Sequence, residues 1–152
     1  MHGGEYEKAR KIAYRYLSYR PRTEYEVGRM LMQKGFDDTI VGRVMENLRE
    51  YRLLDDREFA GRYVARNLRH PRGVLEERLK RLGITESVAR EALEEVDRDT
   101  EIRIAIALAN GRIKRKGDNC FIGDIAAFLQ RRGFDQDVVG RVCNYLENKR
   151  QP

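Results

Sequence analysis

The chain has 152 residues, of which 37% are charged and 41% hydrophobic, and its formal net charge is +6. Its eight tyrosines and five phenylalanines supply enough apolar surface for a packed interior, which excludes a disordered tail. The basic balance favours an anionic partner such as nucleic acid or an acidic protein surface. No run is long enough for a membrane helix, and residues 1–10 lack the apolar core of a signal peptide, so we expect a soluble cytoplasmic protein.

Apolar residues recur at helical spacing nearly throughout, and alternating β-branched runs are missing. The sequence therefore predicts nine helices and no sheet. The first helix is expected over residues 5–19. Thr23 and Glu26 form a capping box that starts a short second helix, which ends at Gly35. Asp37 or Asp38 is expected to cap the third.

The middle of the chain repeats this order of a longer helix followed by shorter ones. Asp55 and Asp56 precede a helix expected to carry apolar residues as far as Leu68, and residues 71–73 are expected to break it. The next long helix is expected to open near Asp99. Two shorter helices follow it.

A sequence repeat accompanies this order of helices. KGFDDTIVGRVMENL at residues 34–48 returns as LGITESVAREALEEV at 82–96 and as RGFDQDVVGRVCNYL at 132–146. The repeat predicts an all-α fold of three tandem three-helix modules, at residues 1–54, 55–98 and 99–152. Small modules depend on their neighbours for a core, so we expect an elongated, curved helical array.

The sequence contains no constellation typical of an enzyme, such as a Gly-rich phosphate loop or a zinc-binding helix. Asp55 and Asp56 could bind a metal or act as acid and base, but a helix cap explains them with less. Cys120 and Cys143 are expected on apolar faces of the last two helices as inert thiols, and His70 in a solvated connection. We therefore expect no catalytic activity, no metal and no cofactor.

Basic residues gather near the entry to each second helix of a module, and more of them stand at the turn that follows. These candidates for contact with an anionic partner are Arg20, Arg22, Lys34, Arg66, Arg69, Arg72, Lys114, Arg115, Lys116, Arg131 and Arg132. A solvated turn explains any single arginine at least as well. The recurrence favours a binding edge for phosphates or carboxylates.

Residues 19–64, YRPRTEYEVGRMLMQKGFDDTIVGRVMENLREYRLLDDREFAGRYV, resemble the signature of the RecX regulatory proteins. That signature contains R-P-R-[ST]-E-x-E, a K-G-[FI] turn and L-L-D-D-x-x-F-A. The matching positions that we expect to be caps and core are Pro21, Thr23, Glu24, Glu26, Gly35, Leu53, Leu54, Asp55, Asp56 and Phe59. The later segment RHPRGVLEERLKRLGI departs in the order of Gly and Pro, and residues 99–152 keep only the repeat pattern.

The resemblance implies a bacterial cytoplasmic modulator of the RecA recombinase. Such proteins lie in the groove of the RecA–DNA filament and mainly inhibit its ATPase, strand-exchange and coprotease activities in recombination, DNA repair and the SOS response. The implied partners are the RecA filament and single- and double-stranded DNA, with no membrane, and we expect a monomer.

Two other functions remain open from the residues themselves. The second helix, Gly35 and the third helix could form a helix-turn-helix of a stand-alone DNA-binding protein, although the third helix offers an acidic face to the phosphates. A helical-repeat adaptor for an acidic protein partner is the other alternative.

Overall fold

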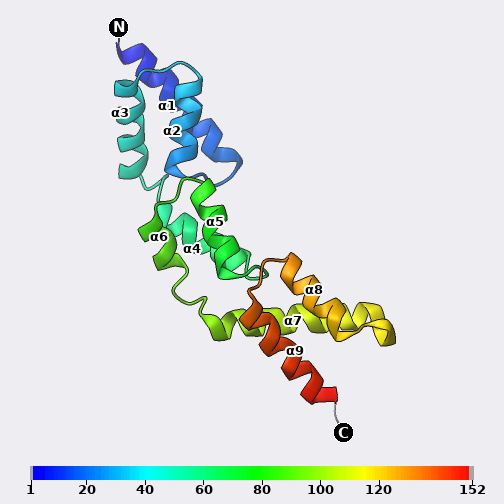
Figure 1. The fold of residues 1–152 in the computed structure, drawn as a ribbon. Coiled ribbons are helices and arrows are strands. Elements are labelled where there is room, and N and C mark those ends of the chain that lie inside the picture. Colours follow the sequence, from blue (N-terminus) through cyan, green and yellow to red (C-terminus); the bar gives the residue numbers. More distant parts are fainter. Residues whose placement is uncertain (1, 151–152) are drawn as a thin grey trace. The chain divides into compact units, whose positions relative to one another are not determined.

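The computed structural model of the chain describes residues 2–150. Within them it contains nine α-helices and a single 3₁₀ turn, and no strand (Figure 1). The helices are α1 (His2–Tyr19), α2 (Glu24–Gln33), α3 (Asp38–Glu50), α4 (Asp56–Arg66), α5 (Arg72–Arg81), α6 (Glu86–Ala92), α7 (Arg98–Lys116), α8 (Ile122–Arg131) and α9 (Gln136–Arg150), and the 3₁₀ turn is η1 (Gly117–Asn119). The all-helical class expected from the sequence is confirmed.

The chain forms two compact units. Unit 1 contains the residues up to 63 together with 78–89, and unit 2 contains 64–77 together with the residues from 90 onward. The boundary therefore passes through α4, α5 and α6. The division into three modules is defined by the sequence repeat and stays a prediction.

The core of unit 1 lies among α1, α2 and α3, which pack against one another (Figure 1). Val27 and Leu31 of α2 meet Val44 and Leu48 of α3, and all four side chains are fully buried. Helix α1 approaches closely because the residues that it buries fully, Ala9 and Ala13, have small side chains. Burial of four such aliphatic side chains contributes several kcal/mol, at about 1.5–3 kcal/mol each.

The core of unit 2 is a second bundle of the same kind, formed by α7, α8 and α9 (Figure 1). Ile125 and Leu129 of α8 and Val142 of α9 are fully buried. Ala105 and Ala109 of α7 pack against them without exposed surface. The two bundles therefore use the same arrangement of two aliphatic helices and one helix with a small-residue face.

Helix caps fix most of the boundaries. Thr23 accepts the backbone N–H of Glu26, whose carboxylate accepts the N–H of Thr23, as the capping box predicts. Asp37 caps α3 through the N–H of Ile40 at 2.9 Å. Asp55 accepts the N–H groups at the start of α4, which confirms the cap expected there.

Several expected boundaries were wrong. The first helix starts at His2 instead of residue 5. Helix α7 does begin near Asp99, at Arg98, and Asp97 caps it through the N–H of Thr100. Helix α4 ends at Arg66, so Leu68 lies outside it. The break covers residues 67–71, because a residue before proline disfavours the helical conformation and Pro71 then starts α5 by accepting the first N–H groups. Cys120 is buried in the turn before α8 and is not on a helix.

Candidate basic binding groove

The first helix of each predicted module follows the same pattern. Each buries a pair of small or β-branched residues four positions apart, and an acidic residue stands four positions before the pair. The three sets are Glu5 with Ala9 and Ala13, Asp56 with Ala60 and Val64, and Glu101 with Ala105 and Ala109. This pattern sets a residue-by-residue register between the modules.

Two of the three acidic residues cap the second helix of the preceding module. The backbone N–H of Glu24, the first residue of α2, donates to Asp56 Oδ1 at 3.0 Å. The N–H of Arg72, the first residue of α5, donates to the carboxylate of Glu101. Burial raises the pKa of both carboxyls, and these hydrogen bonds to the ionised form offset part of that rise. Equivalent residues therefore make equivalent contacts, which supports the register.

A glycine completes each of these contacts. Gly83, in the turn after α5, has φ +85° and lies so close to Tyr25 of α2 that a Cβ added there would overlap the tyrosine side chain. Gly133, after α8, has φ +96° and would place a Cβ against Val74 of α5 in the same way. We call the contacts of Asp56 and Gly83 with α2, in unit 1, the first junction. The contacts of Glu101 and Gly133 with α5, in unit 2, are the second junction.

A basic groove of about 620 Å³ lies beside the second junction. Its apolar lining includes Leu68, which is 43% exposed, and Ile104 and Leu108 of α7, which are half-buried. Four guanidinium groups line the same groove, those of Arg69, Arg103, Arg115 and Arg132. We call this the second groove.

Within the part of the chain that the structure describes, none of these four arginines forms an ion pair. Arg103 donates to Thr100 Oγ1 at 3.1 Å, and Arg115 donates to the carbonyl of Gly111 at 3.3 Å. Arg132 stacks over the ring of Phe128, 5.1 Å from its centroid. Arginine forks bind carboxylates and phosphates in a bidentate fashion, so the second groove can accept a polyanionic ligand.

A carboxylate that interacts electrostatically with Arg103 is occupied elsewhere. Asp97 accepts the backbone N–H of Thr100 at 2.8 Å, and its pKa is lowered chiefly by its hydrogen bonds with Thr100, with a smaller electrostatic contribution from Arg103. The Asp97 side chain therefore serves as a helix cap. The positive charge of the second groove is left available to a ligand.

An equivalent groove of about 500 Å³ lies beside the first junction, and we call it the first groove. In the register, Leu17 and Phe59 of this first groove correspond to Leu68 and Ile104 of the second. Its charges are mixed, because Arg62 pairs with Glu58 at 2.7 Å and Arg20 pairs with a glutamate of α2. The first groove therefore has apolar residues at two equivalent positions, and acidic residues stand among its arginines, whereas no acidic residue lines the second groove.

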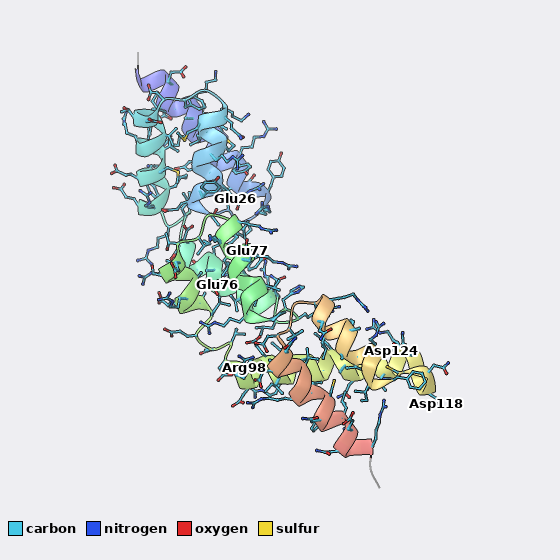
Figure 2. All side chains as sticks on the ribbon, viewed as in Figure 1. Glu26, Glu76, Glu77, Arg98, Asp118 and Asp124 are labelled. Atoms are coloured by element: carbon cyan, nitrogen blue, oxygen red, sulfur yellow. The ribbon has the colours of Figure 1, made fainter. Side chains whose placement is uncertain are left out.

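Three of the arginines expected to contact a partner serve the fold. Arg22 is 14% exposed and stacks on Tyr16, 3.8 Å from the ring centroid. Arg20 and Arg22 both approach the carboxylate of Glu26, which is seen on α2 in Figure 2. Arg72 is half-buried and donates to the carbonyls of Leu93, at 2.8 Å, and of Val96. Arg72 thus satisfies backbone acceptors at the end of α6.

The other expected contact residues are exposed, except for Arg132, which is half-buried. Arg69, Arg115 and Arg132 share the second groove. Lys34 follows α2, and Arg66 is the last residue of α4. Lys114, Lys116 and Arg131 stand in the last turns of α7 and α8 and do not line the second groove. The structure therefore brings only part of the predicted set together.

The residues that carry the family motif are mainly caps, core and ion pairs. Thr23 and Leu54 are buried, and Asp55 and Asp56 cap α4 and α2. Glu24 pairs with Arg49 of α3, which raises the pKa of that arginine. The rest divide between surface and interior: Pro21 and Gly35 are exposed, Leu53 is 48% exposed, Glu26 closes the capping box, and Phe59 is half-buried and stacks on Tyr63.

Sequence reasoning missed Arg103, which lies in the middle of α7 and away from any turn. The register of the first helices contains the signal that would have found it. Arg103 occupies the position of Glu58, so one position changes from an acid to a base between modules.

No cluster of potential metal ligands and no helix long and apolar enough to cross a membrane occurs among residues 2–150.

A family model and several curated proteins that match this chain all carry the same family name. The family model described as "RecX, first three-helix domain" matches residues 9–48. A regulatory protein RecX of Clostridioides difficile is 32% identical over 149 residues, which cover 94% of this chain and 70% of that protein. Those of Geobacillus kaustophilus and Amycolatopsis mediterranei are 31% and 32% identical, and the matches cover 55% and 79% of their lengths.

Solved structures share the fold. The crystal structure of RecX from Lactobacillus salivarius superposes with a TM-score of 0.83 over 95% of this chain and 98% of that one, at 22% identity. A second crystal structure, of a regulatory protein RecX, gives a TM-score of 0.75 over 91% of this chain and 71% of the other, at 24% identity.

Proposed function

The chain belongs to the family of RecX regulatory proteins, and we propose that it regulates RecA by binding the RecA–DNA filament. In this proposal it lowers the ATPase, strand-exchange and coprotease activities of RecA in the bacterial cytoplasm. It acts by occupying the filament and carries out no chemistry of its own. Membership in the family supports the choice of RecA as partner.

The second groove is the observation that carries the proposed binding mode. Four guanidinium groups without ion pairs surround an apolar lining, in a chain whose net charge is +6. A nucleoprotein filament offers DNA phosphates and acidic protein side chains along its length, and both are ligands for arginine forks. The mixed apolar and cationic lining fits such a surface better than a small neutral molecule.

We further propose that the three repeat modules contribute several weak contacts to one filament. Exposed basic side chains outside the second groove would extend the contact, and these are Lys34, Arg66, Lys114, Lys116 and Arg131. Linked weak sites bind a repetitive polymer more tightly than any single site does. Arg20, Arg22 and Arg72 are left out of this contact set because their guanidinium groups already bind within the chain.

The test is the rate of ATP hydrolysis by RecA on single-stranded DNA, with the protein added at micromolar concentration. The wild-type chain should lower the rate. The double variant Arg69→Ser with Arg115→Gln should need about tenfold more protein for the same inhibition, because two unpaired charges are lost. The matched control is Arg62→Gln with Arg141→Gln, which removes the same charge from arginines that pair with Glu58 and Asp137.

Three results would overturn the proposal. The wild-type chain could leave hydrolysis unchanged, or the control pair could weaken inhibition as much as the groove pair. Alternatively, affinity for naked DNA could equal affinity for the filament and fall steeply with salt, which indicates a stand-alone DNA-binding protein.

A further inference from the structure

Three turns of this chain share one backbone conformation, and only two of them are covered. Gly35, Gly83 and Gly133 follow the second helix of each module with φ +93°, +85° and +96°. A Cβ at Gly83 or Gly133 would collide with side chains of α2 or α5, respectively, whereas a Cβ at Gly35 would meet nothing within 4 Å. The turn at Gly35 therefore presents the covered surface of both junctions to solvent.

The residues that precede α2, α5 and α8 show the opposite pattern, because two of them are covered and the third is open. Thr23, which precedes α2, is fully buried, and Pro71, which precedes α5, is also buried. Phe121 occupies the same place before α8, yet 68% of its surface is exposed. A position that is buried twice within the chain thus holds an exposed phenylalanine at its third occurrence.

The carboxylate of each junction also has a counterpart at the open turn. Asp56 and Glu101 accept the first N–H of α2 and of α5. The equivalent acid is Glu5 of α1, which is exposed and lines a pocket of about 260 Å³ together with Gly35. The equivalent donor is the N–H of Ile122, the first residue of α8.

Both surfaces carry charges of both signs, because Glu5 lines the pocket at Gly35 and Arg150 donates to the carbonyl of Cys120, next to Phe121. Lys8 and Lys34 line the pocket at Gly35. Asp118 and Asp124 lie together where the chain passes from α7 into α8, on either side of Phe121 in the sequence (Figure 2). The lysines of one surface can therefore face the aspartates of the other.

We propose that the start of α8 in one copy of this chain docks on the Gly35 turn of a second copy. In this contact Phe121 lies beside Gly35, as Pro71 lies beside Gly133, and Glu5 accepts the N–H of Ile122. Phe121 takes over the covering role of Tyr25 and Val74, whose positions in α8 are held by Gly123 and Asp124. The contact joins two different surfaces, so it is a head-to-tail contact that leaves one of each surface open for further copies. The second copy is the favoured occupant because this one chain carries both an open glycine turn with its acid and an open helix start, and two such pairs already meet within it.

This proposal departs from the monomer expected from the sequence. A single junction without the covalent linkage is a small contact, so association should be weak in dilute solution and should grow with concentration. Copies held close together on one polymer would meet this condition. The contact needs neither RecA nor DNA to form, so its test is independent of the proposed function.

The experiment is sedimentation equilibrium of the full chain up to about 1 mM, a range that detects weak association. Phe121→Ser removes the docking side chain and leaves a residue favoured at a helix start. Gly35→Asn blocks the receiving turn with a residue that tolerates positive φ. Tyr51→Ser is the matched control, because Tyr51 is an aromatic residue with 67% of its surface exposed at another site.

The average mass of the wild-type chain and of Tyr51→Ser should rise with concentration, and each of the two docking variants should associate about tenfold more weakly. A mixture of Phe121→Ser and Gly35→Asn should again form dimers, of one copy each, because each variant keeps the surface that the other has lost. A symmetric contact cannot give this rescue. If Gly35→Asn unfolds, as judged by circular dichroism, Lys34→Glu takes its place.

A wild-type mass that stays constant up to about 1 mM would overturn the proposal. The same holds if the docking variants associate like the wild type, or if their mixture stays monomeric.

Discussion

The first and second junctions are built alike but present different charges to solvent. In each, a carboxylate caps the helix of the preceding module and a glycine turn packs against it. Beside them, Glu58 of the first groove pairs with Arg62, whereas Arg103 holds the equivalent position in the second groove without an ion pair. The repeat therefore conserves the contacts that hold modules together and leaves the adjoining surface free to specialise.

The difference extends beyond one position. Ser18 of the first groove corresponds to Arg69 of the second, and Asp55 corresponds to Thr100. Each change adds positive charge or removes negative charge. These three changes outweigh the loss of Arg62, whose equivalent is Ala107, and make the second groove the more cationic of the two.

Substitutions of the glycines in the turns at the two junctions should give the largest effects on stability. We expect Gly83→Ala to lower the free energy of unfolding by about 1–2 kcal/mol from the positive φ, and by another 1–3 kcal/mol from overlap with Tyr25. Gly133→Ala should cost somewhat less, because its added Cβ meets the outer methyl of Val74. Urea unfolding followed by circular dichroism measures both.

Gly35→Ala is the matched control, since it has the same backbone strain and open space around its Cβ. We expect it to cost only the strain, about 1–2 kcal/mol. An equal loss in all three variants would show that the packing at the two junctions adds nothing to stability.

Charge reversal in the second groove should have the next largest effect, this time on binding. Arg103→Glu gives the second groove the residue of the first, and we expect affinity for RecA filaments on single-stranded DNA to fall about tenfold, with little change in stability. Fluorescence anisotropy of a labelled chain measures the affinity. An unchanged affinity would mean that the second groove does not face the filament.

The reciprocal change should have a smaller effect of opposite sign. Glu58→Arg gives the first groove the residue of the second and releases Arg62 from its ion pair. We expect affinity for the same filament to rise about threefold, since one exposed charge adds modestly to a multivalent contact. Weaker binding would indicate that the mixed charges of the first groove are themselves recognised.

The caps and turns of the chain could be predicted from its sequence because they depend on local chemistry. Thr23 and Glu26 form the capping box that their spacing of three indicates, and Gly35 adopts the positive φ expected after a helix. The apolar faces of α3 and α8 follow from periodicity in the same way.

The roles of the arginines could not be predicted, because a guanidinium can bind within the chain or remain free, and only its tertiary neighbours decide which. Arg22 finds Tyr16, and Arg72 finds carbonyls more than twenty residues away. Proximity to a turn therefore did not identify the binding residues. Arg103 could be identified as a groove residue only from the register between modules. That register appears once the buried small residues of the first helices are known.

The smallest expected effect is the response of Asp56, the carboxylate of the first junction, to pH. Burial raises the pKa of Asp56, so the folded chain holds this proton more tightly than the unfolded chain, and its contribution to stability falls as pH rises. Asp56→Asn keeps an oxygen to accept the N–H of Glu24 and has no charge to bury. We expect the variant to be slightly more stable than the wild type at neutral pH, with the difference shrinking as pH falls toward about 3.9.

Asp135 supplies the control of opposite sign. Its pKa is lowered chiefly by the hydrogen bond from Arg98, so its contribution to stability is present at neutral pH and is lost as pH falls. Asp135→Asn should therefore be less stable than the wild type at neutral pH, and this difference too should shrink in acid. Urea midpoints between neutral pH and about pH 3.9 measure both. A stabilising effect of Asp135→Asn, or a destabilising one of Asp56→Asn, would show that packing, not charge, governs these two positions.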